Sequence, residues 1–262
     1  MSSDTQWLRF RRWLDRVLPP TIILVVLLIV WQASVRILDL PPWLLPAPSD
    51  IAARFGRTNN LGYHTGMTVL EALSGFVIAA IFGISLSGGI VHSRFLERGL
   101  LPYIIVSNAI PIIAIMPLLT IWFGFGIVPK IVICAIISFF PIVTNTTRGL
   151  RSADYRVIEF MRSINATPVQ VFLKVQLPSA LPFIFAGFKI AASLALVGAV
   201  VAEFYSSDRG LGYLIITSAT ELRTDLLFVA ITILAVLGVV SFAVFGRLER
   251  WVTRGQEAKA II

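Results

Sequence analysis

Long apolar stretches alternate with short polar ones along nearly the whole chain. A membrane-spanning helix needs about 20 mostly apolar residues, and the pattern offers six such stretches. We therefore predict spans at Val17–Val35, Thr65–Val91, Leu101–Trp122, Pro129–Gly149, Pro182–Glu203 and Asp225–Gly246. The third carries no charge but contains prolines, so we expect one kinked helix there. This pattern predicts an all-α membrane protein with six transmembrane helices.

The longest polar interruption in the second half, Glu159–Pro182, has the pattern of two short amphipathic helices. Asn165 suits the left-handed conformation that ends a helix, and Thr167 followed by Pro168 suits the start of another. We expect Leu177–Pro178 to end this second helix. Such an elbow at a membrane surface fits a groove on a soluble partner, but an ordinary connecting loop accounts for the same residues.

Composition excludes several other classes of protein. The chain is 57% hydrophobic with a mean hydropathy of +0.86, more apolar surface than a soluble domain can bury. The single cysteine, Cys134, lies in an apolar run and excludes a disulfide framework or a Cys-based metal site. His64 and His92 are far apart in sequence. No phosphate-binding P-loop motif is present, so we expect no cofactor in this chain and no ATP hydrolysis by it.

Lysine and arginine positions give the orientation. With the N-terminus in the cytoplasm, fifteen of the 22 Lys and Arg residues fall on the inner side, six fall on the outer side, and Lys189 lies within a span. This explains the net charge of +8 better than a nucleic-acid partner does. We predict a basic amphipathic N-terminus on the inner face (1–17), a six-span transmembrane domain (18–249) with a cytoplasmic elbow (152–178), and a cytoplasmic tail (250–262).

Polar groups inside spans are costly and often functional. Our candidates for a translocation path are Ser107, Asn108, Ser138, Phe139, Ser193 and Glu203. Each has a structural alternative: a helix–helix hydrogen bond for Asn108, a packed core for Phe139, and for Glu203 an ion pair with Arg209 or contact with water. Glu71, in the outer half of the second span, is a further polar group of this kind.

The elbow resembles the "EAA" loop of bacterial ABC-importer permeases, the binding-protein-dependent transport inner-membrane family. The family pattern is Glu-Ala-Ala, three residues, Gly, nine residues, then Ile-x-Leu-Pro. Its places are held without a gap by Glu159, Phe160, Met161, Asn165, Val175, Leu177 and Pro178. Phe160 and Met161 replace the alanines, which would alter the fit to the partner. Asn165 replaces the glycine and preserves the bend, because Asn tolerates positive φ.

The resemblance extends from about Thr21 to Glu249 and is to the nitrate, sulfonate and taurine branch, through segments such as PPWLLPAPSD and SFFPIVTNTTRGL. It implies a type I ABC importer permease fold in the bacterial inner membrane, a second copy of this chain, and an extracytoplasmic substrate-binding protein. Separate ABC ATPase subunits would hold ATP and Mg. The resemblance implies that the ATPase contacts are made by Glu159, Phe160, Met161, Asn165, Ala166, Thr167, Pro168, Val169, Leu177 and Pro178.

The stretch from Pro178 to Ile215 looks closer to permeases for pyrimidine thiamine precursors or riboflavin than to those for nitrate. We therefore expect a small heteroaromatic nutrient as the solute, with aliphatic sulfonate or taurine, nitrate or bicarbonate as alternatives. An ion-coupled secondary transporter is the rival from a different class, favoured by inverted repeats and midspan carboxylates, neither of which is evident. A membrane enzyme is a third option, but no His, Asp and Glu residues are grouped for chemistry.

Overall fold

The computed structural model describes residues 3–107 and 110–257, and these segments are predominantly helical. The elements are α1 (Ser3–Ile37), α2 (Pro48–Arg57), α3 (Leu61–His92), α4 (Arg94–Ser107), the 3-10 turn η1 (Ile112–Ile115), α5 (Met116–Phe123), α6 (Ile127–Arg151), α7 (Tyr155–Ser163), α8 (Pro168–Val171), the π-helical segment η2 (Phe172–Gln176), α9 (Leu177–Ser206), α10 (Leu211–Thr220) and α11 (Thr224–Glu257). The chain forms two units. One contains the chain up to Asn59 with Thr217–Val229, and the other contains Asn60–Ile216 with the segment from Ala230 onward.

Five helical stretches within the described residues are long and apolar enough to cross a membrane. They are Leu18–Ile37, Leu61–His92, Ile127–Arg151, Pro168–Tyr205 and Thr224–Thr253. They coincide with five of the six predicted spans, and the all-helical class is confirmed.

The prediction of one kinked span over Leu101–Trp122 is wrong. Helix α4 ends at Ser107, and the chain resumes as the turn η1 followed by α5. Pro111 has extended dihedral angles (φ −61°, ψ 111°) and precedes η1 as its cap. A proline also disfavours the helical conformation of the residue before it, so the helix breaks where we expected only a kink.

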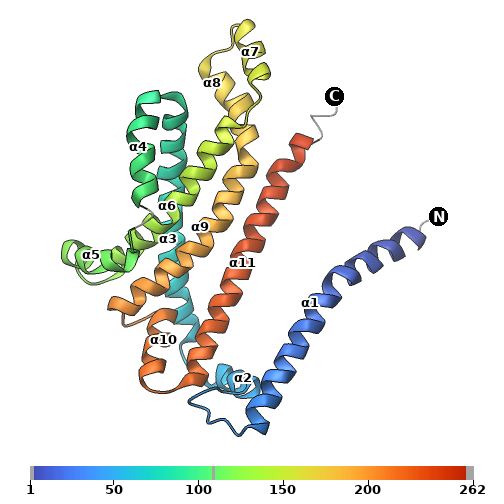
Figure 1. Ribbon diagram of the computed structural model, residues 1–262, viewed down its shortest axis with the longest axis vertical. Coiled ribbons are helices and arrows are strands. Elements are labelled where there is room, and N and C mark those ends of the chain that lie inside the picture. The colour runs from blue at the N-terminus through green and yellow to red at the C-terminus, as the bar shows by residue number, and fades with distance from the viewer. Residues whose placement is uncertain (1–2, 108–109, 258–262) are drawn as a thin grey trace. The chain divides into compact units, whose positions relative to one another are not determined.

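Helices α3, α6 and α9 pack side by side and form the core of the larger unit (Figure 1). Small side chains let these helices approach closely. The buried cluster is dominated by alanines from α3 and α9: Ala72, Ala79, Ala191, Ala192, Ala195 and Ala199. At Gly75 of α3 any Cβ atom would collide with the Cβ atom of Cys134 on α6. The three helices therefore fit together only with small residues at these contacts.

The elbow connects α6 to α9 at one end of this three-helix core, and α10 follows the opposite end of α9 (Figure 1). Asn165 has φ 58°, which confirms the predicted bend. Thr167 caps α8 in a reciprocal capping box with Gln170, in which each side chain accepts a backbone N–H from the other residue.

The expected stop at Leu177–Pro178 is wrong, because the helix continues from Pro168 to Tyr205. Pro178 has no N–H to donate to the carbonyl four residues earlier. The π-helical segment η2 lies directly before it, and such wider turns change the hydrogen-bond register within a helix. The second arm of the elbow is thus the first part of a long apolar helix that continues as α9.

Positive φ at Asn165 leads to a testable prediction. Asn165→Gly should leave the melting temperature of the purified protein unchanged, because glycine adopts this conformation freely. Asn165→Val should lower it, since the left-handed conformation costs an ordinary L-residue about 1–2 kcal/mol and a β-branched residue is a clear outlier there. Equal melting temperatures for the two variants would show that the bend does not constrain this position.

In the smaller unit α2 begins after Ala47, with Pro48 in its first turn, and neither Ser49 nor Asp50 caps it. Instead the Asp50 carboxylate accepts a hydrogen bond from Arg36 of α1 at 2.8 Å. Ser49 exchanges hydrogen bonds with Gln32, also on α1. These polar contacts tie the end of α1 to the start of α2.

Candidate functional site

The elbow exposes apolar side chains on both of its arms. No residue of α7 is buried. Phe160 is 63% exposed, Ile164 59% and Val169 64%. Large apolar side chains grouped on a surface outside the membrane usually mark a contact with another protein. The elbow therefore presents an exposed apolar surface on both arms.

The other predicted coupling residues surround this surface. Met161 and Ala166 are half-buried at the bend, and Leu177 and Pro178 are half-buried at the start of α9. Glu159 is exposed on α7, and its hydrogen bond with the phenol of Tyr155 raises the Tyr155 pKa. Among the described residues Glu159 forms no ion pair with Arg162, three residues later on α7.

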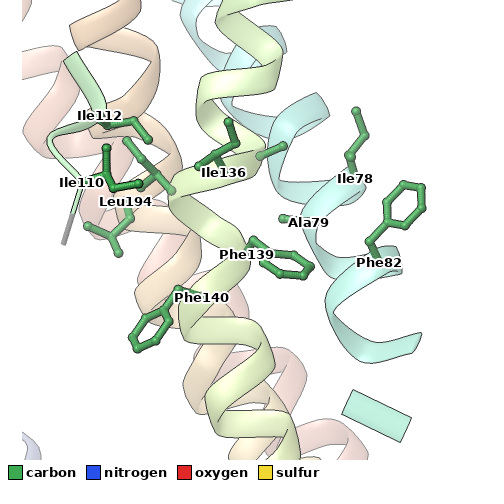
Figure 2. A pocket seen from close by; sticks show the side chains of 11 residues that line it. Ile78, Ala79, Phe82, Ile110, Ile112, Ile136, Phe139, Phe140 and Leu194 are labelled. Carbon is green, nitrogen blue, oxygen red and sulfur yellow. The ribbon is translucent and has the colours of Figure 1, made fainter. Parts of the chain in front are cut away.

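A cavity of about 550 Å³ lies along α6, between this helix and its neighbours. Its walls come from α3, α6, α9 and the broken third span (Figure 2): Ile78, Ala79, Phe82, Ile110, Ile112, Ala135, Ile136, Ile137, Phe139, Phe140 and Leu194. Every one of these side chains is uncharged and apolar. The cavity can therefore hold an apolar or aromatic group and offers no partner to a charged one.

Of the predicted path residues whose side chains the structure describes, only Phe139 lines this cavity. Ser138 is buried and donates to the backbone carbonyl of Ala191 at 3.1 Å, so it joins α6 to α9. Ser193 hydrogen-bonds within its own helix, to the carbonyl of Lys189. Ser107 ends α4 without a described side chain, and Asn108 lies outside the described residues.

Glu203 belongs to a buried charged cluster at the end of α9 away from the elbow. Glu71 of α3, Lys130 of α6 and Glu203 of α9 are 0%, 3% and 1% exposed. The Lys130 Nζ atom lies 2.6 Å from Glu71 Oε1. Buried charges are tolerated only when they are paired and hydrogen-bonded, so this cluster fixes the three core helices to one another.

The same cluster holds the loop between α9 and α10. Glu203 accepts hydrogen bonds from the Thr68 hydroxyl at 2.7 Å and from the Gly212 backbone N–H. Lys130 donates to Ser207 in the loop at 2.8 Å. A Cβ atom at Gly210, which has φ 106°, would overlap the Glu203 carboxylate. The loop can therefore follow this course only with glycine at that position.

The expectation that Glu203 pairs with Arg209 or faces water is wrong. Arg209 instead binds Asp208 at 2.8 Å and the Tyr63 hydroxyl at 3.1 Å. Its guanidinium group lowers the pKa of Asp208 by hydrogen bonding to the carboxylate. Sequence reasoning also missed Lys130 as the partner of Glu71. The Glu71 carboxylate itself could have indicated such a partner, since a buried charge in a membrane span needs an opposite charge nearby.

Comparison with known proteins gives the family. Residues 75–254 match the family described as binding-protein-dependent transport system inner membrane component. The riboflavin transport system permease protein RibX of Chloroflexus aurantiacus is 38% identical, over 92% of this chain and 91% of its own length. An Escherichia coli permease named for aliphatic sulfonates is 34% identical, over 92% of each chain.

The fold agrees with this assignment. A chain of the MetNI methionine ABC transporter, in an inward-facing conformation, superposes with a TM-score of 0.65 at 20% identity. The match covers 74% of this chain and 96% of that one. The likeness in fold therefore covers about three quarters of this chain. The chain belongs to the binding-protein-dependent transport inner-membrane family and is the permease subunit of an ABC importer.

Proposed function

We propose that this permease moves a small heteroaromatic nutrient, such as riboflavin or a pyrimidine thiamine precursor. The observation that supports this proposal is the cavity along α6, whose lining is apolar throughout and includes Phe82, Phe139 and Phe140. Flat aromatic rings stack well on phenylalanine. A nitrate, bicarbonate or sulfonate ion would lose its hydration there without gaining a partner.

Sequence identity to the relatives distinguishes poorly between these candidate solutes, whereas the chemistry of the cavity walls distinguishes better between them. The relative named for riboflavin is 38% identical and the one named for aliphatic sulfonates is 34% identical, over the same share of this chain. The proposal therefore depends on the chemistry of the cavity walls, with the riboflavin relative as support.

The proposed assembly has two copies of this chain, two ABC ATPase subunits that bind ATP and Mg, and an extracytoplasmic substrate-binding protein. The exposed apolar elbow would enter a groove on each ATPase, with Ala166–Val171 at its tip and Glu159 beside it. The lysine and arginine distribution supports an elbow and two termini in the cytoplasm. Helix α9 continues directly from the elbow and would carry its movement into the membrane.

Solute binding by the partner tests this proposal. The substrate-binding protein that copurifies with the permease should bind riboflavin or an aminopyrimidine in isothermal titration calorimetry. Proteoliposomes containing the whole complex should accumulate the same compound when ATP is supplied. A binding protein selective for taurine, an alkyl sulfonate, nitrate or bicarbonate would contradict the heteroaromatic assignment while leaving the importer class intact.

A charge in the cavity should block uncharged solutes. Ile136 lines the cavity and is 41% exposed, so Ile136→Glu should fold but place a carboxylate in an apolar wall. We expect ATP-driven uptake of the ring compound to fall at least about tenfold, the equivalent of roughly 1.4 kcal/mol. Ile136→Leu is the matched control and should transport normally. Equal uptake by Ile136→Glu would show that the solute does not pass this wall.

A further inference from the structure

We propose a second solute-contacting site at the elbow end of α6, formed by Thr147, Arg148 and Arg151. At this site hydrogen-bond donors would meet oxygen atoms of the passing solute. The inference depends on the chain being a permease, which is shown by its family, and not on the heteroaromatic cargo proposed above.

These residues line a pocket of about 590 Å³ that is separate from the apolar cavity. Its lining comes from α4, α6 and α9 and the residue that follows α6: Ile104, Thr144, Thr147, Arg148, Arg151, Ser152 and Phe183. Unlike the cavity, it combines two guanidinium groups with three hydroxyl groups. The pocket is therefore polar and basic, whereas the cavity is apolar.

The two hollows follow each other along one face of α6. Residues three or four apart on a helix share a face, and the series 136, 140, 144, 148 and 151 has this spacing. Ile136 and Phe140 line the apolar cavity, and Thr144, Arg148 and Arg151 line the pocket. A solute that leaves the cavity toward the elbow along this face would next meet the arginines.

The hydroxyls that line the pocket are not equally satisfied, because those of Thr144 and Ser152 donate to backbone carbonyls and that of Thr147 does not. Thr147 is 6% exposed, yet its hydroxyl has no hydrogen-bond partner among the described residues. Buried hydroxyls in native proteins are nearly always bonded to protein or to water. An orphan hydroxyl in the wall of a pocket therefore indicates that water or a ligand group occupies the space in front of it.

The two arginines are held at the pocket in different ways. Arg151 pairs with Glu97 of α4 at 2.7 Å. The Arg148 guanidinium lies over the Phe183 ring, 5.9 Å from its centroid, and is absent from the ion pairs of the described residues. Guanidinium groups donate and cannot accept. The site therefore suits a group with acceptor oxygens: a ring carbonyl, a carboxylate or a sulfonate.

Basic residues are also common at the inner ends of spans without any solute role. Two observations argue for more than that here. The exposed Arg148 guanidinium lies over an aromatic ring, and Thr147, one residue earlier, lines the same pocket and has a buried hydroxyl without a partner among the described residues. An arginine that only marks the inner end of a span requires neither of these two features.

Thiol labelling tests the site without knowledge of the cargo. Cys134 is the chain's one cysteine and is fully buried, so a Thr144→Cys variant places one accessible thiol in the pocket. The full-length chain, with the subunits that copurify, is placed in lipid nanodiscs. It is then treated with anionic and cationic methanethiosulfonates of similar size. The measured quantity is the ratio of the anionic to the cationic labelling rate. At Thr144→Cys this ratio should exceed that of a free thiol about fivefold or more, because the arginines attract the anionic reagent.

Adding Arg148→Gln to Thr144→Cys should reduce this preference at least about threefold, whereas Arg148→Lys, which keeps the charge, should retain most of it. Arg162→Gln, on the elbow and outside the pocket, is the matched control and should have no effect. Ser163→Cys on the elbow and Val239→Cys on α11 serve as solvent-exposed and apolar references. A Thr144→Cys thiol that is unreactive, or that shows no charge preference dependent on Arg148, would overturn the proposal.

Discussion

Replacement of Ala166 by arginine is expected to abolish ATP-driven uptake. Ala166 is half-buried at the bend of the elbow, beside Asn165 and the capped start of α8. In the proposed assembly this tip enters the ATPase groove, where a bulky charge cannot be accommodated. Disruption at the centre of an interface costs about 2 kcal/mol or more, which corresponds to roughly a thirtyfold loss of affinity. The measurement is copurification of the ATPase together with uptake in proteoliposomes.

Charge reversal at Glu159 provides a second test of the same surface. Glu159→Arg should weaken coupling less than Ala166→Arg, because the carboxylate is exposed and a surface ion pair contributes little. Ala53→Arg is the matched control, since it adds the same charge at an exposed alanine of α2. Normal transport by both elbow variants would refute the docking role of the elbow.

Lys130→Met is expected to destabilise the larger unit severely. It removes the cation that lies 2.6 Å from Glu71 and leaves that carboxylate buried without its partner. Loss of one partner of a buried ion pair costs about 3–5 kcal/mol. We expect low yield and a much lower melting temperature in detergent. The loop at Ser207 should also become sensitive to protease, because its hydrogen bond to Lys130 is lost.

The double variant Lys130→Met/Glu71→Met separates the loss of one charge from the loss of the pair. Replacing a buried ion pair by apolar residues of similar volume is often neutral or stabilising. The double variant should therefore recover most of the stability that Lys130→Met loses. If Lys130→Met alone were as stable as the parent protein, the cluster would not hold the core helices together.

Local chemistry made much of the elbow predictable from sequence. Asn165 at positive φ and Thr167 before Pro168 determine the bend and the new helix start, whatever the rest of the fold does. The end of the second arm was not predictable in this way. Pro178 reads as a helix stop, but the π-helical segment before it lets the helix continue.

The cavity and the charged cluster could not be predicted from the sequence, because both depend on the tertiary structure. Glu71 and Lys130 are 59 residues apart, so their pairing depends on how α3 packs on α6. Ser138 and Ser193 looked like path residues because a polar group in a span is costly. The structure satisfies each of them with a backbone carbonyl. The apolar cavity has no polar signal in the sequence, and among our candidates with described side chains only Phe139 lines it.

Affinity purification of this chain from its native cells in mild detergent, with mass spectrometry of the copurifying proteins, tests the central claim most directly. We predict a stoichiometric ABC ATPase that is lost when Ala166 is replaced by arginine. A stable preparation without any ATPase, combined with uptake driven by a proton or sodium gradient, would contradict the claim and indicate a secondary transporter.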